Sequence, residues 1–305
     1  MASIDIEFDD FENFLSLDAR LDISKNNEKD KRAELKWGYI SYDINRKTKI
    51  NVGRFLSSNN KFSFTAPELQ IGPDVPITAM MPSVDGVRID WKDRNFELGL
   101  SLTRGISNEI NNSNRSGNSK AFTLRSGVLL AGTRKSMADF LSDSKSPFGA
   151  YVGCSLHYES ADLQTESEGS FVNWSIEGHL DFSGPLFSIL YQKEQTAGLR
   201  KNGFNGSRPW GILIQASHPL AENWNLYGQN QIFDYDIPGQ PLLRLSTIGV
   251  SWEVDKSSKI HFDYSRASSP FIAFFDGATS NQGWREQAVD GNDQSLLRLQ
   301  WTYMF

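Results

Sequence analysis

The chain has 305 residues, 39% of them hydrophobic and 12% aromatic, which is enough to bury a sizeable core or to close one large barrel. Its 31 Lys and Arg residues against 37 Asp and Glu give a net charge of −6, which argues against general affinity for nucleic acid. No run of eighteen apolar residues occurs, so helical membrane spans are excluded. Cys154 is the single cysteine, so an intrachain disulfide is excluded as well.

The N-terminus lacks the basic region and the apolar region of a secretory signal peptide. The chain is therefore either cytoplasmic or the mature form of an exported protein with an added start. The strand pattern below favours the mature form. Residues 4–8 alternate between apolar and polar types, and the pattern leaves three roles open: an inner tether, part of the first strand, or a small extra strand.

The first clear strand covers residues 14–23, with leucines on one face and Asp18 and Arg20 on the other. Several charged residues at one parity cannot face a dry core, so they suit a water-filled lumen. In the next strand, 32–42, we expect Trp37 and Tyr39 to face outward and Lys36 inward.

Similar alternation continues along the chain and predicts about fourteen strands, with 12–16 acceptable. Beyond the first two, they cover residues 47–55, 84–91, 96–102, 122–130, 150–156, 171–182, 186–191, 210–217, 224–233, 242–254, 259–266 and 296–305. The cleanest, 171–182, turns at Ser183-Gly184 into its neighbour, as a tight hairpin would. Connections alternate between long and short, and only 133–147 breaks this order.

The last strand carries Leu297, Leu299, Trp301, Tyr303 and Phe305 on one face and polar residues on the other. A two-sided strand of this length can cross a bilayer within a closed barrel, although a soluble strand can alternate in the same way. The alternation of long and short connections, which puts the long loops at one end of the strands, favours the barrel. Long external loops with short periplasmic turns are typical of outer-membrane barrels, and Trp and Tyr near strand ends would form the interfacial girdles. We therefore predict an all-β fold: one transmembrane antiparallel β-barrel domain spanning residues 1–305.

In such a barrel the working groups are the charges that face the lumen and a loop that narrows it. Segment 56–83 carries several prolines, which argue against a strand, and is the candidate constriction loop through Glu68 and Asp74; segment 267–294 is predicted to be a long external loop. The predicted lining residues carry both signs of charge: Asp18, Arg20, Lys36, Arg88, Glu97, Arg125, Glu177, His179, His261, Asp263 and Arg298.

Three stretches carry a family resemblance. Residues 35–42, followed by 50–55 ending in Gly-Arg-Phe, resemble the early hairpin of Gram-negative porins. Residues 83–87 resemble the strand start after the long loop of the same proteins. Residues 224–227 and 297–300 are similar to the C-terminal third of the phosphate-selective porin group, but the lumen parity carries mixed charges in place of that group's arginine ladder and lysine cluster. The terminal Phe305, with Trp301 and Tyr303, resembles the signal read by the barrel-assembly machinery.

The resemblance implies an outer-membrane porin: a passive diffusion channel for small hydrophilic solutes or ions. Its expected surroundings are the lipid bilayer, lipopolysaccharide and the barrel-assembly machinery, either as a monomer or as a homotrimer. Two other hypotheses remain open. One is an outer-membrane barrel plugged by its loops and acting as an adhesin, a receptor or an enzyme. The other is a soluble β-sandwich.

Enzymatic chemistry finds little support. The four histidines (His157, His179, His218 and His261) are dispersed, and none has a metal-ligand partner at i+2 or i+4. His157 and His179 have the same parity on neighbouring predicted strands, so the pattern allows the two side chains to lie close together. No Gly-x-Ser-x-Gly, phosphate-cradling glycine loop or zinc spacing occurs. We expect no catalytic residue, no metal and no cofactor.

Overall fold

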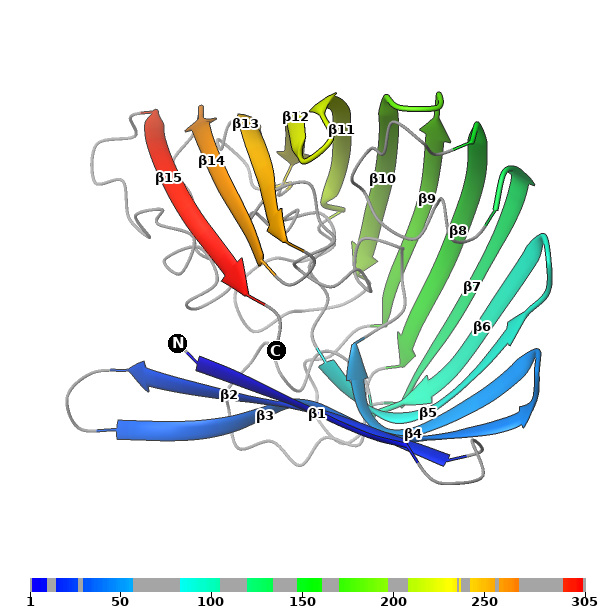
Figure 1. The fold of residues 1–305 in the computed structure, drawn as a ribbon. Coiled ribbons are helices and arrows are strands. Elements are labelled where there is room, and N and C mark those ends of the chain that lie inside the picture. The colour runs from blue at the N-terminus through cyan, green and yellow to red at the C-terminus, as the bar shows by residue number, and fades with distance from the viewer. Residues whose placement is uncertain are drawn as a thin grey trace.

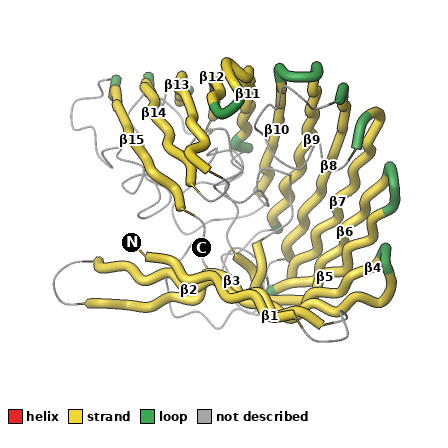
Figure 2. Tube along the Cα trace, viewed as in Figure 1, coloured by secondary structure: helices red, strands yellow, loops and turns green. Residues whose placement is uncertain are grey.

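The computed structural model of the chain describes residues 2–9, 15–26, 30–56, 83–104, 120–133, 147–160, 170–196, 208–234, 236, 242–255, 258–268 and 293–303, with side chains described mainly from residue 38 onward. These residues form fifteen strands (Figures 1 and 2). Their bounds are β1 (Ala2–Asp9), β2 (Leu15–Asn26), β3 (Asp30–Asn45), β4 (Thr48–Leu56), β5 (Ser83–Lys92), β6 (Phe96–Thr103), β7 (Lys120–Ala131), β8 (Gly149–Ser160), β9 (Phe171–Asp181), β10 (Leu186–Thr196), β11 (Trp210–Ala221), β12 (Trp224–Asp234), β13 (Leu243–Asp255), β14 (Ser258–Ala267) and β15 (Gln294–Tyr303).

The strands form one sheet in which each pairs antiparallel with its neighbours in sequence. The sheet curls around a central space, which brings β15 and β1 to opposite sides of the remaining gap (Figure 1). All fourteen predicted strands are present, and the extra one is β1, whose role the sequence left open. No helix in the described ranges is long and apolar enough to cross a membrane.

The connections sort into two ends. Residues 46–47, 93–95, 182–185 and 222–223 make short turns, and β13 ends and β14 begins on the same side, which we call the short-turn end. The strand ends that flank segments 57–82, 105–119, 161–170, 197–209, 235–242 and 268–293 lie on the opposite side, which we call the long-loop end. The predicted turn at Ser183-Gly184 is confirmed: both residues have positive φ (61° and 145°), and the N–H of Phe182 donates to the carbonyl of Pro185 at 2.8 Å. Segment 133–147 falls largely outside the described residues.

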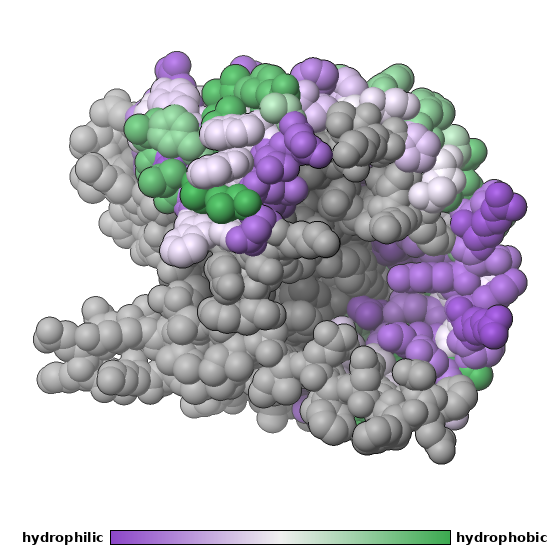
Figure 3. Space-filling model, viewed as in Figure 1, coloured by the Kyte–Doolittle hydropathy of each residue, from purple (hydrophilic) through white to green (hydrophobic). Residues whose placement is uncertain are grey.

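The two faces of the sheet have the reverse of a soluble protein's polarity. Outward side chains are apolar and exposed, as at Leu299 (75%), Leu130 (65%) and Leu102 (62%), whereas inward side chains are polar and buried, as at His157 (0%) and Glu177 (2%). Water would penalise that outer face heavily, but lipid would not. Hydrophilic side chains gather at the turns that join β3 to β4 and β5 to β6 (Figure 3).

On β8 the apolar outer band has the height of a bilayer core. On β8 and its preceding turn, outward apolar positions run from Phe148 to Tyr158, both nearly half exposed. Ten residue steps cover about 33 Å along a strand, or roughly 25 Å along a barrel axis at a tilt of ~40°, which is the height of the outward apolar band of outer-membrane barrels.

Aromatic side chains mark both edges of that band. Near the short-turn end, Trp224 and Trp252 stack with ring centroids 5.5 Å apart and planes at 5°, and Phe182 contacts Phe187 edge-on at 5.8 Å. Near the long-loop end, Tyr191 lies between Trp174 and Trp210, at 5.2 and 6.5 Å. Outward aromatic rings at two heights are the girdles expected at the two interfaces of a membrane.

The predicted outward orientation is wrong for Tyr39, and the register assigns the same inward position to Trp37, whose side chain lies outside the described set. Tyr39 faces inward, where it packs against Phe55 and Val84, although its alternation with Leu35 predicted an outward side chain. The cause is a register shift: Arg20 pairs with Trp37 and the next residue, Leu21, pairs with Leu35, so Lys36 has no opposing partner. An extra residue in one strand reverses the facing of everything beyond it.

Candidate functional site

The inward face of β3–β15 is the candidate functional surface, because it gathers charged and hydrogen-bonding side chains around the central space. Of the predicted lining residues, those whose side chains are described all lie on this face: Arg88, Glu97, Arg125, Glu177, His179, His261, Asp263 and Arg298. By register, Asp18 and Arg20 take inward positions on β2 opposite Tyr39 and Trp37, but their side chains, like that of Lys36, lie outside the described set. Glu68, Asp74 and Phe305 lie outside the described residues altogether.

Arg125 is the centre of the largest charged group. One guanidinium nitrogen lies 2.6 Å from Glu97 Oε1, and the other lies 2.9 Å from Glu177 Oε1 and donates to the Tyr151 hydroxyl at 2.7 Å. That hydroxyl donates in turn to Glu97 Oε1 at 2.7 Å. Two carboxylates around one guanidinium leave the group with a net charge of −1, and four strands (β6–β9) contribute to it.

Two inward glycines make room for this group. A Cβ atom on Gly127 would collide with the Tyr151 ring and hydroxyl, and one on Gly153 would lie 2.6 Å from Glu177 Oε1. Any larger residue would therefore displace the ring or the carboxylate that holds Arg125. The tyrosine covers the exposed backbone of the glycine in return, a pairing that compensates for weak glycine positions in sheets.

A second group of the same design lies across β12–β15. Arg298 Nη2 lies 2.7 Å from Asp263 Oδ1, while the Tyr227 hydroxyl donates to Asp263 Oδ2 at 3.1 Å. Tyr227 also covers a glycine: a Cβ atom on Gly249 would lie 2.6 Å from the phenol oxygen. The last strand is thus joined to its neighbour by an ion pair as well as by the backbone ladder.

A third polar chain crosses β3–β5. Asp90 Oδ2 accepts from Arg88 Nε at 2.8 Å and from Asn51 Nδ2 at 2.9 Å, and Ser41 donates to Asn51 Oδ1 at 2.5 Å. The Arg88 guanidinium lies over the Phe55 ring, 5.1 Å from its centroid. The ion pair with Asp90 and the contact with the Phe55 ring therefore hold the Arg88 guanidinium close to the inward face of the sheet.

The histidines do not form a pair. On the β8–β9 ladder His157 pairs with Asn173 and His179 with Tyr151, so the two imidazoles are separated by six residues along the strands. Each contacts a hydroxyl through Nδ1 at 2.8 Å: Thr123 for His157 and Ser188 for His179. Within the described residues, no cluster of His, Cys, Asp and Glu could hold a metal ion.

Uncharged side chains line part of the inward wall, where Glu194 on β10 also takes an inward position. A row of amides and hydroxyls crosses β10–β14, made of Ser188, Gln215, Gln229, Thr247 and Ser265. Beside it Leu190 and Leu213 are fully buried and belong to one apolar cluster. Sequence reasoning missed this row, as it missed Tyr151, Tyr227 and Asp90. The signal for the tyrosines was available: each shares its parity with an inward glycine on the neighbouring strand.

Comparison with known proteins supports the fold. No family model and no curated protein matches the sequence. Among solved structures, an anion-selective porin from Comamonas acidovorans superposes with a TM-score of 0.62 at 12% identity, covering 97% of this chain and 87% of that one. OmpT of Vibrio cholerae in its trimer form gives 0.59 at 10% identity, covering 98% and 90%. OprB of Pseudomonas putida gives 0.58 at 8% identity, covering 95% and 83%. The chain has the fold of Gram-negative outer-membrane porins, an antiparallel β-barrel.

Proposed function

We propose that this protein is an outer-membrane porin, a passive diffusion channel for ions and small hydrophilic solutes through a lumen lined by charges of both signs. The observation that carries the proposal is the reversed polarity of the sheet: a bilayer-high apolar face outside and a charged, hydrogen-bonding face inside. The similar porin structures support the same proposal through the fold alone. The protein performs no covalent chemistry, and its working residues are wall charges.

The lumen has an uneven charge distribution. Arg88, Arg125 and Arg298 are each held by carboxylates, and the row of uncharged side chains runs from β10 into the group on β12–β15, where Ser265 contacts Arg298. Fixed charges of both signs on a curved wall create a transverse field that sorts solutes by charge and size. We propose that this field, together with a loop from segment 56–83 carrying Glu68 and Asp74, sets the selectivity.

The test is conductance in a planar lipid bilayer with refolded protein and a KCl gradient. Discrete current steps support the porin, and the sign of the reversal potential reports whether cations or anions pass more easily. A protein that inserts but passes no current would contradict the proposal. Refolding is monitored independently by the shift in SDS gel mobility on heating.

A plugged barrel is the second candidate, because inward side chains such as His157, Glu177 and Ser265 are almost completely shielded from solvent. A narrow or plugged lumen would explain that burial. The plugged barrel is favoured if the protein inserts into the bilayer without passing current and the long loops show adhesion or receptor activity.

The proposed setting is the outer membrane, where the barrel-assembly machinery reads the C-terminal strand with Trp301, Tyr303 and Phe305. Trp301 is 69% exposed on the outward face, and its indole N–H donates to Ser258 at 2.7 Å. One similar structure is described as a trimer, which makes a homotrimer the assembly to test. The mass of the unheated protein in SDS distinguishes a trimer from a monomer.

A further inference from the structure

A row of uncharged hydrogen-bonding side chains follows one level of the inward wall across β10–β14. Cross-strand register sets its members side by side, and we call it the amide–hydroxyl row: Ser188, Gln215, Gln229, Thr247 and Ser265. Both ends of the row have hydrogen-bond partners. The Ser188 hydroxyl lies 2.8 Å from Nδ1 of His179, and the hydroxyls of Thr247 and Ser265 lie 2.8 Å apart. The two glutamines in the middle differ from the ends.

Gln215 on β11 and Gln229 on β12 are direct cross-strand partners, and both side chains are buried, with 3% and 8% of their surfaces exposed. The Nε2 atom of each amide finds no hydrogen-bond acceptor in the part of the chain that the structure describes. Burying a donor without a partner lowers stability, and native proteins keep few such groups. Two adjacent amides with unmet donors therefore indicate that an acceptor group binds there.

Apolar side chains lie on either side of the two amides along the same strands. Leu213 is two residues from Gln215, and Tyr227 is two residues from Gln229, so both also face inward. Together with Leu190 of β10, which pairs with Leu213, they belong to one apolar cluster. The site thus combines amide donors with apolar surface.

The inward positions of β11 and β12 carry no charged side chain within the described ranges. They are Gly211, Leu213, Gln215, Ser217 and Pro219 on β11, and Asn225, Tyr227, Gln229, Gln231 and Phe233 on β12. An ion bound here would give up part of its hydration shell without a fixed opposite charge in return, so an ion is disfavoured. A neutral solute meets no such penalty.

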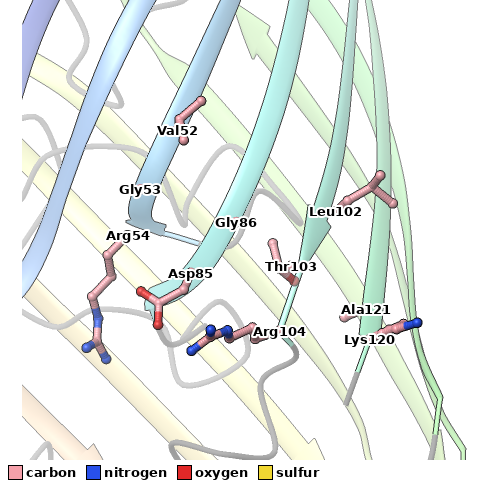
Figure 4. Close-up of a pocket in the computed structure, with 10 residues that line it drawn as sticks. All are labelled: Val52, Gly53, Arg54, Asp85, Gly86, Leu102, Thr103, Arg104, Lys120 and Ala121. Carbon is pink, nitrogen blue, oxygen red and sulfur yellow. The ribbon is translucent and has the colours of Figure 1, made fainter. Parts of the chain in front are cut away.

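Thr103 on β6 provides a comparison, because its hydroxyl is also inward, buried and without a partner among the described residues. It lines a pocket of about 650 Å³ along β4–β7 (Figure 4). Its cross-strand partners are Gly86 and Ala121, which carry no hydrogen-bonding side chain. A single hydroxyl offers one contact to a solute, whereas the two glutamines offer a pair of donors.

We propose that Gln215 and Gln229 form a binding subsite for an uncharged, polyhydroxylated solute of monosaccharide size on its way through the lumen. This inference rests on the proposed function, because the solute has to enter the lumen. The two Nε2 groups donate to hydroxyl oxygens of the solute, and its C–H surface packs on Leu213 and Tyr227. Burial keeps bulk water from competing for the donors, so each hydrogen bond contributes more than on an open wall.

The experiment measures how D-glucose lowers the KCl current through the full chain in a planar lipid bilayer. The decrease beyond that of the bulk solution, as a function of glucose concentration, gives an apparent dissociation constant. The test variant is Gln215→Met with Gln229→Met, which keeps the length of both side chains and removes the donors, and the matched control is Thr103→Val. We expect the test variant to bind glucose about tenfold more weakly than the wild type, because two neutral hydrogen bonds are lost, and the control to stay within about twofold.

Equal glucose affinity in the test variant and the wild type, or an equal loss in the control, would overturn the proposal. Gln215→Met alone repeats the comparison should the double variant not refold. Sodium gluconate, a hydroxylated anion of similar size, tests the charge of the ligand, and we expect it to bind more weakly than glucose. Equal or stronger binding of gluconate would contradict a subsite for neutral solutes.

Urea unfolding in vesicles without sugar tests whether the two amides serve the fold alone. Their donors lack partners among the described residues, so the test variant should unfold at no lower urea concentration than the wild type. A lower midpoint of unfolding in the test variant would show that the glutamines stabilise the barrel through contacts of their own, and the subsite would be contradicted.

The current before sugar is added separates this inference from the proposed function. A wild-type protein that conducts but does not respond to glucose would contradict the subsite and leave the porin intact. A wild-type protein that inserts without conducting would contradict the porin, and with it the subsite, which depends on an open lumen.

Discussion

The hydroxyl group of Tyr151 occupies the space that a Cβ atom on Gly127 would need. The two residues lie on neighbouring strands, β7 and β8, and the glycine lets the phenol reach Arg125 and Glu97. The same relationship recurs between Tyr227 and Gly249 on β12 and β13. Two tyrosine–glycine pairs therefore organise the two charged groups of the wall.

Gly127→Ala should destabilise the folded barrel by about 1–3 kcal/mol, because the new methyl group displaces the Tyr151 ring and overpacks the wall. The matched control is Gly178→Ala, whose Cβ would meet only Ile189 at an ordinary 3.4 Å. Urea unfolding in vesicles, followed by tryptophan fluorescence, measures both. Equal urea midpoints of unfolding for the two variants would show that the packing of Tyr151 on Gly127 does not contribute to stability.

Arg125→Gln should shift the reversal potential toward cation selectivity. The substitution removes one positive charge and leaves Glu97 and Glu177, each within 3 Å of the former guanidinium, without their partner. A buried carboxylate left unpaired also costs about 3 kcal/mol, so the barrel should unfold at lower denaturant concentration. Arg94→Gln, in an exposed turn, removes the same charge outside the lumen and should leave selectivity unchanged.

Leu299→Arg and Gln300→Arg should differ sharply although they are adjacent. Leu299 is outward and exposed, whereas Gln300 is inward and pairs with His261. A cation on the lipid face costs about 2–4 kcal/mol near the bilayer midplane, whereas one in a wet lumen costs little. Unfolding free energies in vesicles test this difference. Were Leu299→Arg to be the milder change, the outward face would not be in lipid.

The sequence was a good guide wherever alternation is unbroken. On β9, Trp174 and Ile176 against Ser175 and Glu177 follow the predicted faces, because a period of two leaves only one choice once one face is apolar. Tyr39 was misplaced because a one-residue register shift leaves no mark in composition.

The sequence did not predict which side chains contact each other across neighbouring strands. That Arg125 would lie between Glu97 and Glu177 depends on the stagger of three ladders, and stagger follows from turn geometry more than from the strands themselves. His157 and His179 share a parity on adjacent strands, yet they lie six residues apart for the same reason. Residue type and parity predict the face of a side chain, whereas register decides its neighbours.

The most direct test is thiol modification during conductance recording. In a Cys154→Ser background, which removes the native outward thiol, Gln300→Cys would place a thiol on the inward face and Leu299→Cys one on the outward face. A charged, water-soluble methanethiosulfonate should lower the current through open channels of the Gln300→Cys protein and leave the Leu299→Cys protein unaffected. Equal reactivity at both positions, or a current indifferent to modification at Gln300→Cys, would contradict a conducting lumen lined by the polar face.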